Sequence, residues 1–160
     1  MTKIVLFPIA ALFSFASLAC SGSADGTGAS NPFAGTWRCE GTSTTTYSTP
    51  AGMPATTEPS ASTVTIVDDG DDRITTIRLP DNGAPECTLR AHVDGDATTL
   101  DPSQSCTSLN GGIVAYTSGA TRMTSATTYT ASHTWSYTGT TAKGVALVGT
   151  GSGSSTCTKQ

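Results

Sequence analysis

The sequence predicts an all-β domain, an antiparallel up-and-down meander of strands, and three observations lead to this class. Threonine makes up roughly a fifth of the 160 residues, and its branched Cβ favours strands over helices. The 17 glycines and 8 prolines supply turns. Several segments alternate between apolar and polar side chains, and no long segment has the period of a helix.

The clearest alternation lies between residues 127 and 138. Its odd positions hold Thr127, Tyr129, Ala131, His133, Trp135 and Tyr137, and its even positions hold only Thr and Ser. Residues 37–47 and 87–94 alternate in the same way. Successive side chains of a strand point to opposite faces, so each segment is predicted to be a half-buried antiparallel strand.

Dipeptides typical of hairpin turns separate the predicted strands. Asp69-Gly70, Asp94-Gly95 and Asn110-Gly111 are strong signals because their residues tolerate positive φ angles. Ser118-Gly119 and the segment 139–144 are weaker signals. These turns divide the chain into about eight strands.

The segment 48–62 contains Pro50, Pro54 and Pro59 and is not expected to form a central strand. We expect it to be a long loop in the first hairpin. This loop either covers the open end of a barrel or lies on the surface as a plain linker. Met53, its one large apolar side chain, would dip into the barrel in the first case.

The N-terminal residues predict export and a lipid anchor. Lys3 precedes an apolar run, Ile4–Ala19, which is shorter than the ~20 residues that span a bilayer and typical of a signal peptide. The run ends in Ser17-Leu18-Ala19-Cys20, which resembles the lipobox of bacterial lipoproteins. This resemblance implies that residues 1–19 are removed and that Cys20 carries the lipid. The alternative is an ordinary signal peptide in which Cys20 has no role.

Residues 20–31 are expected to tether the domain to a membrane. Their small and polar side chains are typical of a flexible linker, which would hold the domain roughly 18 Å from the lipid. Ser21, rather than Asp, follows Cys20. In a host with two membranes, the resemblance to lipoproteins then implies the outer membrane.

Four cysteines remain once Cys20 is set aside, and none forms a Cys-x-x-Cys pair. An even number in an exported protein indicates two disulfides, which allow three pairings. We favour Cys39–Cys157, which would join the two ends of the domain, and Cys87–Cys106, which would close a short segment.

A meander must hide its edge strands, and an eight-stranded barrel does so by pairing the first strand with the last. This barrel is the architecture predicted for residues 32–160, and a two-sheet β-sandwich is the alternative. Cys39 opposite Cys157 across the seam would place Tyr47 opposite Gly149 and Thr45 opposite Gly151. The glycines at positions 149, 151 and 153 share one face, where they leave room for bulky neighbours.

The start of the domain resembles the lipocalins and the wider calycin group. The segment Asn31-Pro32-Phe33-Ala34-Gly35-Thr36-Trp37 contains the Gly-x-Trp that opens their first strand. The resemblance implies a barrel that binds a small apolar molecule in its cup, with Trp37 packed at the closed end. Lipocalins usually stack an arginine from near the last strand on this tryptophan. After Arg122 this chain has only Lys143 and Lys159.

The leading functional hypothesis is a non-enzymatic module that binds a small apolar or amphipathic ligand inside the barrel. The side chains expected to line the cup are Tyr129, His133, Trp135 and Tyr137, with Ile66, Leu89 and Val93. The rival hypothesis is a surface-structural or protein-interaction lipoprotein with a filled barrel. A net charge of -4 argues against nucleic acid as a partner.

No cofactor, metal site or enzymatic activity is predicted. The chain lacks a Gly-x-Ser-x-Gly elbow and a His-Glu-x-x-His motif. His92 has the opposite parity from the apolar residues of its segment, so we expect it to face solvent, away from His133. The run Asp68-Asp69-Gly70-Asp71-Asp72 offers carboxylates to Ca²⁺, but it lacks the distal Glu of an EF-hand loop. We interpret it as an acidic hairpin tip.

Overall fold

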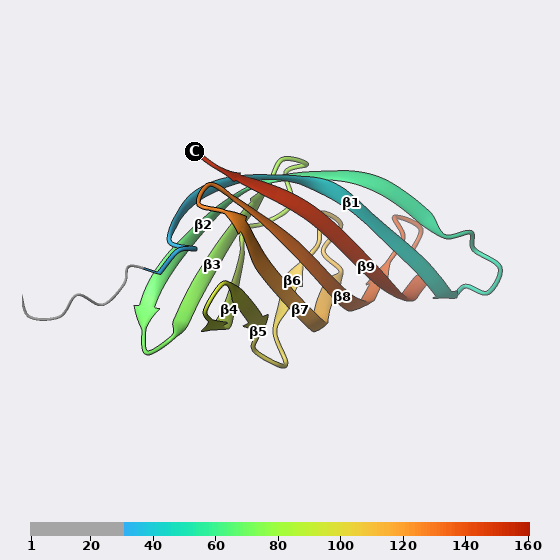
Figure 1. The fold of residues 1–160 in the computed structure, drawn as a ribbon. Coiled ribbons are helices and arrows are strands. Elements are labelled where there is room, and N and C mark those ends of the chain that lie inside the picture. Colours follow the sequence, from blue (N-terminus) through green and yellow to red (C-terminus); the bar gives the residue numbers. More distant parts are fainter. Residues whose placement is uncertain (1–30) are drawn as a thin grey trace, which may run out of the picture.

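The alternating segments form nine strands in the computed structural model, which describes residues 31–160 (Figure 1). The strands are β1 (Gly35–Thr49), β2 (Thr56–Gly70), β3 (Arg73–Pro80), β4 (Cys87–Asp94), β5 (Ala97–Leu100), β6 (Ser105–Thr107), β7 (Ile113–Ser125), β8 (Thr128–Thr140) and β9 (Ala146–Lys159). The described part of the chain contains no helix long and apolar enough to cross a membrane. The predicted signal peptide, 1–19, and nearly all of the predicted tether lie outside the described residues.

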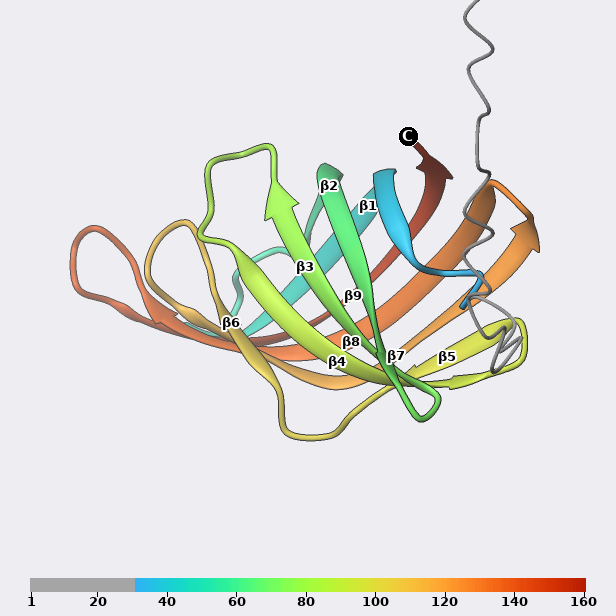
Figure 2. The same cartoon turned by 90° about the vertical axis from the view of Figure 1, so that its left-hand side faces the viewer.

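Eight of these strands close into an antiparallel barrel. The ring follows the order β5-β4-β3-β2-β1-β9-β8-β7, and β5 returns to β7 through pairs from Ala97↔Arg122 to Thr99↔Ala120. β6 is a short extra strand that pairs only with the beginning of β7. Figure 2 shows the long strands β1, β9, β8 and β7 together in one curved wall. The predicted eight-stranded barrel is confirmed, and the alternative sandwich is not formed.

β1 and β9 form the predicted seam. Their opposite residues include the three pairs that the sequence argument named: Cys39↔Cys157, Thr45↔Gly151 and Tyr47↔Gly149. Both favoured disulfides are present, one across this seam and the other, Cys87–Cys106, between β4 and β6. Disulfides persist in oxidising compartments, so their presence indicates that the domain is exported.

The core lies at the end of the barrel where β1 begins, which we name the closed end. Phe33 and Trp37 are fully buried there, and Nε1–H of Trp37 donates a 2.8 Å hydrogen bond to the carbonyl of Phe33. Tyr129 packs edge-on against Trp37 with ring centres 4.8 Å apart. The ammonium group of Lys159 lies 5.2 Å from the centre of the Trp37 ring. This cation–π contact places the positive charge of Lys159 over the buried Trp37 ring.

The barrel wall is interrupted between β5 and β6, and the side chain of Gln104 bridges the interruption. Its amide oxygen accepts the backbone N–H of Arg90 at 2.6 Å, and its amide nitrogen donates to the Arg90 carbonyl at 2.8 Å. The backbone carbonyl of Gln104 accepts the N–H of Tyr116 at 2.8 Å. A side chain thus supplies the hydrogen bonds that a continuous strand would make to β4.

The structure corrects the interpretation of residues 48–62. β1 continues to Thr49 and β2 begins at Thr56, so the loop is limited to residues 50–55. Pro59 lies within β2, opposite Thr42. Pairing between β2 and β3 ends at Ser62↔Pro80, so Pro59 lies where this side of β2 is a free edge. Proline is tolerated on such an edge because its missing N–H breaks no pairing there.

Two turns also differ from the prediction. The turn between β2 and β3 is Asp71-Asp72, with φ angles of 51° and 57°. The register shifts between Asp68 and Gly70, and this shift moves the turn beyond Asp69-Gly70. Ser118-Gly119 lies inside β7, next to a second register shift, and the chain turns instead at residues 126–127. In both places, residues that are typical of turns lie at an irregularity inside a strand.

Removing the Cys39–Cys157 bond should destabilise the domain more than removing Cys87–Cys106. The two bonds span 118 and 19 residues of sequence. Loop entropy in the unfolded chain then gives roughly 4–5 kcal/mol for the first and roughly 3 kcal/mol for the second. Urea unfolding of the two double Cys→Ala variants, followed by circular dichroism, measures the difference. A larger loss in the Cys87/Cys106 variant would contradict this expectation.

Candidate functional site

Two neighbouring spaces inside the barrel form the candidate site. The larger, about 360 Å³, lies at the end away from Trp37, and we name it the mouth. The smaller, about 110 Å³, lies deeper, and we name it the inner cavity. Arg78, Tyr116 and His133 line both spaces and therefore form a waist between them.

Glycines on β9 make room for the rings of β8. A Cβ at Gly151 would lie 2.4 Å from the Trp135 ring, and one at Gly153 would lie 2.8 Å from Nε2 of His133. Real side chains do not approach so closely, so both rings occupy space that only glycine leaves free. The rings are thereby held against the β9 backbone, at the wall of the barrel. This is the role that the sequence pattern of alternate glycines predicted for a bulky neighbour.

The rings of the mouth come from three strands and contact one another. Tyr47 and Tyr137 meet edge to face with centres 6.3 Å apart. His133 lies 5.2 Å from Trp135 and 5.7 Å from Tyr116, measured between ring centres. Trp135 is only 8% exposed, so its ring is fixed by packing. The mouth therefore presents a cluster of rings among polar and small side chains.

Arg78 is a residue of the site that the sequence analysis missed. On β3 it has the same parity as Ile74, whose side chain is buried in the core. Its Nε–H donates a 3.2 Å hydrogen bond to Oγ of Ser62 on β2. The parity of β3 was a signal that could have found it, but a charged residue is ordinarily assigned to the surface.

The waist is positively charged through Arg78 alone. Burial, and secondly the positive charge of Arg78, lower the pKa of His133 to about 4. The imidazole of His133 is therefore neutral at pH 7. Burial raises the pKa of Tyr129, and the charge of Arg78 opposes that rise. The guanidinium group thus acts on two titratable groups of β8 that line the inner cavity.

Three of the four predicted ligand-contact residues, His133, Trp135 and Tyr137, line the mouth. Tyr129 does not, because it belongs to the core of the closed end and only borders the inner cavity. Eight residues of extended strand separate Tyr129 from Tyr137, which is about 26 Å at 3.3 Å per residue. One inward face therefore reaches from the closed end to the mouth.

The aliphatic residues predicted to line the cup also lie at different positions along the barrel. Leu89 lines the inner cavity, whereas Ile66 and Val93 belong to the core of the closed end. Met53 is 37% exposed and lines neither space. In Figure 1 the hairpin of β1 and β2 projects beyond the neighbouring strands. Of the two alternatives for this loop, the structure has the plain surface loop and not the one that carries Met53 into the barrel.

The acidic run at residues 68–72 lies at an exposed hairpin tip. Asp68 accepts the backbone N–H of Gly70 at 3.0 Å, and Asp69 accepts the hydroxyl of Thr75 at 2.6 Å. His92 is exposed on β4. Within residues 31–160 no three His, Cys, Asp or Glu side chains are grouped as metal ligands.

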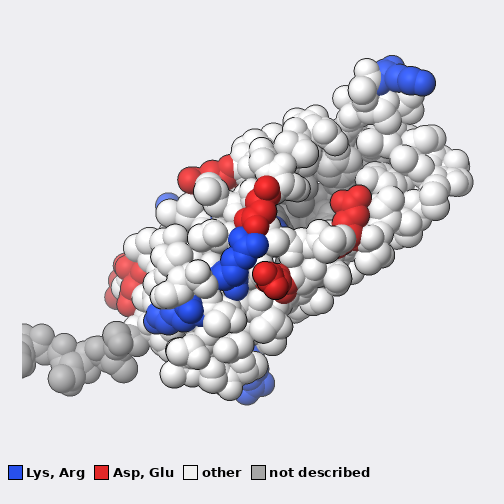
Figure 3. All heavy atoms as spheres, turned by 90° about the horizontal axis from the view of Figure 1, so that it is seen from above, with Lys and Arg blue, Asp and Glu red and all other residues white. Residues whose placement is uncertain are grey.

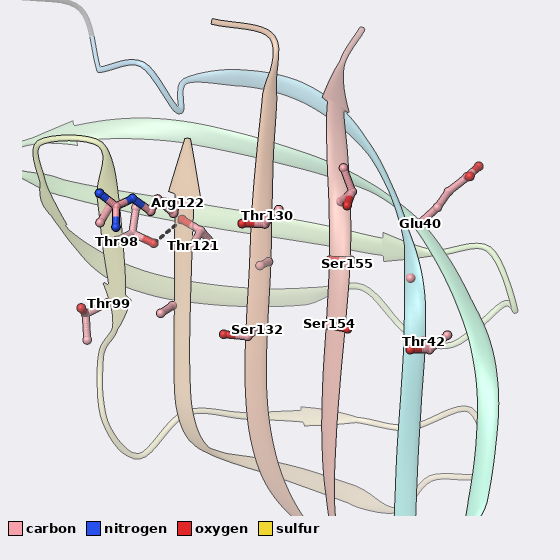
Figure 4. Close-up of a pocket in the computed structure, with 15 residues that line it drawn as sticks. Glu40, Thr42, Thr98, Thr99, Thr121, Arg122, Thr130, Ser132, Ser154 and Ser155 are labelled. Carbon is pink, nitrogen blue, oxygen red and sulfur yellow. Dashed lines mark hydrogen bonds between the residues drawn. The ribbon is translucent and has the colours of Figure 1, made fainter. Parts of the chain in front are cut away.

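A third hollow, about 580 Å³, is lined mainly by exposed side chains of the barrel wall (Figure 4). Hydroxyl groups from five strands dominate it, among them Thr42, Thr130 and Ser154. Glu40 and Arg122 are its charged residues. Seen from above, the molecule carries few and scattered charges, with basic groups next to acidic ones (Figure 3). The hollow is therefore polar mainly through uncharged hydroxyl groups.

Comparisons with known proteins leave the family open. No family model matches the chain, and no curated protein matches it. One similar solved structure is a protein of unknown function from the DUF3598 family of Nostoc punctiforme, with 16% identity and a TM-score of 0.42. Another is the vaccine antigen transferrin-binding protein B of Haemophilus parasuis, with 15% identity and a TM-score of 0.35. Each alignment covers 81% of this chain but only 48% and 27% of those chains, respectively.

Replacing Gly151 by alanine should disturb the mouth. The added Cβ would lie 2.4 Å from the Trp135 ring, so the ring must move, at an expected cost of about 1–3 kcal/mol in stability. Urea unfolding and tryptophan emission measure the effect. Ser152→Ala, at the exposed neighbouring position, is the control and should change neither quantity. Equal behaviour of the two variants would show that the ring is not held against β9.

Proposed function

We propose that this protein is an exported, lipid-anchored barrel that binds a small apolar or amphipathic ligand in its mouth. The observation that carries the proposal is the mouth of about 360 Å³, in which the rings of Trp135 and His133 are held at the wall by the glycines of β9. Ligand pockets are typically concave, largely apolar and of a few hundred Å³. Leu109, at the rim of the mouth, is 55% exposed and adds apolar surface there. No enzymatic activity, cofactor or nucleic acid is part of the proposal.

The lipid anchor is proposed from the lipobox-like sequence that ends in Cys20. Asn31, the first described residue, lies just before Phe33 at the closed end. A tether attached there would leave the mouth at the far end of the barrel. This arrangement is compatible with a ligand that reaches the mouth from the surrounding medium. In a host with two membranes we propose the outer membrane as the site of anchoring.

A filled barrel that serves a surface-structural or protein-interaction role is the second candidate. The small volume of the inner cavity, about 110 Å³, and the 8% exposure of Trp135 favour it. The two candidates make opposite predictions about the mouth. Only an open mouth binds an apolar probe saturably.

Single-tryptophan variants should separate these candidates. Trp135 lines the mouth, whereas Trp37 is fully buried at the closed end. With an apolar fluorescent dye or a fatty acid as the probe, Trp37→Phe should keep most of the emission change on binding. Trp135→Phe should lose most of it. Absence of saturable binding at micromolar concentrations would remove the ligand-binding proposal and leave the filled barrel.

Cys20→Ala should release the protein from the membrane without unfolding the barrel. Cys20 lies outside the described domain and contributes to neither disulfide. We expect the mature wild-type protein to begin at a lipidated Cys20 and to fractionate with membranes, whereas the variant is soluble and keeps its circular dichroism spectrum. Mass spectrometry that finds an unmodified Cys20 within the mature chain would contradict the anchor.

A further inference from the structure

We infer that the mouth selects amphiphiles with an anionic head group and that Arg78, at the waist, binds this group. The inference rests on the proposed function, since it names the class of ligand that the mouth takes. The ligand would enter with its charge first. Its apolar part would then lie among the aromatic rings of the mouth.

The first argument is that Arg78 is the only cation in the linings of the mouth and the inner cavity. The one acidic residue in either lining is Glu58. The guanidinium group of Arg78 is bonded to Ser62 on β2, and Glu58 is four residues further along that strand, about 13 Å at 3.3 Å per residue. Glu58 is therefore too distant to form a salt bridge with the guanidinium group.

The second argument is that Arg78 keeps unused donors. A guanidinium group has five N–H donors, and the hydrogen bond to Ser62 uses only the one on Nε. Arg38, Arg73 and Arg122 form salt bridges within the described residues, but Arg78 does not. A half-buried cation without a counter-ion is costly, and an anion that accepts its free N–H groups would remove this cost.

The third argument concerns the side chains that line the waist together with Arg78. Tyr116 and His133 line the same two spaces, and neither side chain makes a hydrogen bond to another residue within 31–160. The phenol of Tyr116 and a ring N–H of neutral His133 are both available as donors. A carboxylate or sulfonate at the waist could thus accept hydrogen bonds from β3, β7 and β8. An alcohol or a quaternary amine could not use the guanidinium charge.

Four probes with the same decyl chain test this selectivity: decanoate, decanesulfonate, decanol and decyltrimethylammonium. Binding is followed by the emission of Trp135 in the Trp37→Phe background at pH 7. We expect the two anions to bind about 10- to 100-fold more tightly than decanol, the range that hydrogen bonds to a charged group provide. Decyltrimethylammonium should bind most weakly. Equal affinity for all four would overturn the inference and leave the proposed function intact, whereas no binding by any would overturn both.

Arg78→Gln tests the residue. Glutamine still offers an N–H to Ser62 but has no charge, so the affinity for the anions should fall to that for decanol, while decanol binding is unchanged. Arg78→Lys should keep part of the preference. Arg90→Gln is the matched control, because it removes the same charge from an exposed position on β4, and it should keep the full preference. Retained preference in Arg78→Gln, or equal loss in both Gln variants, would overturn the assignment.

Discussion

The register between β1 and β9 is the constraint on which the rest of the structure depends. A strand that slips by one residue turns its whole inward face outward. Here the disulfide between Cys39 and Cys157 joins directly opposite residues and so fixes the register at one point. β8 pairs with the other edge of β9, in a register that brings Trp135 beside Gly151 and His133 beside Gly153. The disulfide therefore fixes in place the strand against which the rings of β8 pack.

The two ends of the barrel are built on different principles. At the closed end, large side chains fill the interior, and Lys159 from the last strand covers the ring of Trp37. Toward the mouth, the inward positions of β9 are glycines, and the large rings come from β1, β7 and β8. On the other side of the barrel, strands β5 and β6 are short. Gln104 and the Cys87–Cys106 bond connect this part of the chain to β4. The barrel wall therefore consists of long strands on one side and of short strands joined by side-chain bonds on the other.

Much of the fold was predictable because one face of each long strand is buried. That condition makes the period of two visible in the sequences of β4 and β8. The register of β1 against β9 could be predicted by placing Cys39 opposite Cys157. The errors arose where local composition and tertiary context disagree. Pro59 is compatible with β2 because the pairing of β3 ends before it, and Ser118-Gly119 resembles a turn although it lies at an irregularity inside β7. Tyr129 belongs to the core because of its position along the barrel axis. That position depends on how neighbouring strands are staggered against one another, which no single segment of the sequence reveals.

Arg78 shows why part of the site escaped the sequence analysis. Its parity on β3 pointed inward with Ile74, but burying an arginine is costly unless the surroundings provide a space and a partner. Such a space exists only once eight strands have closed and the glycines of β9 have moved the rings of β8 to the wall. Side chains larger than glycine at positions 151 and 153 would push the rings of Trp135 and His133 inward and reduce the space at the waist. The glycines and the inward cation are therefore parts of one arrangement, in which small residues on one strand make a charge on the opposite wall tolerable.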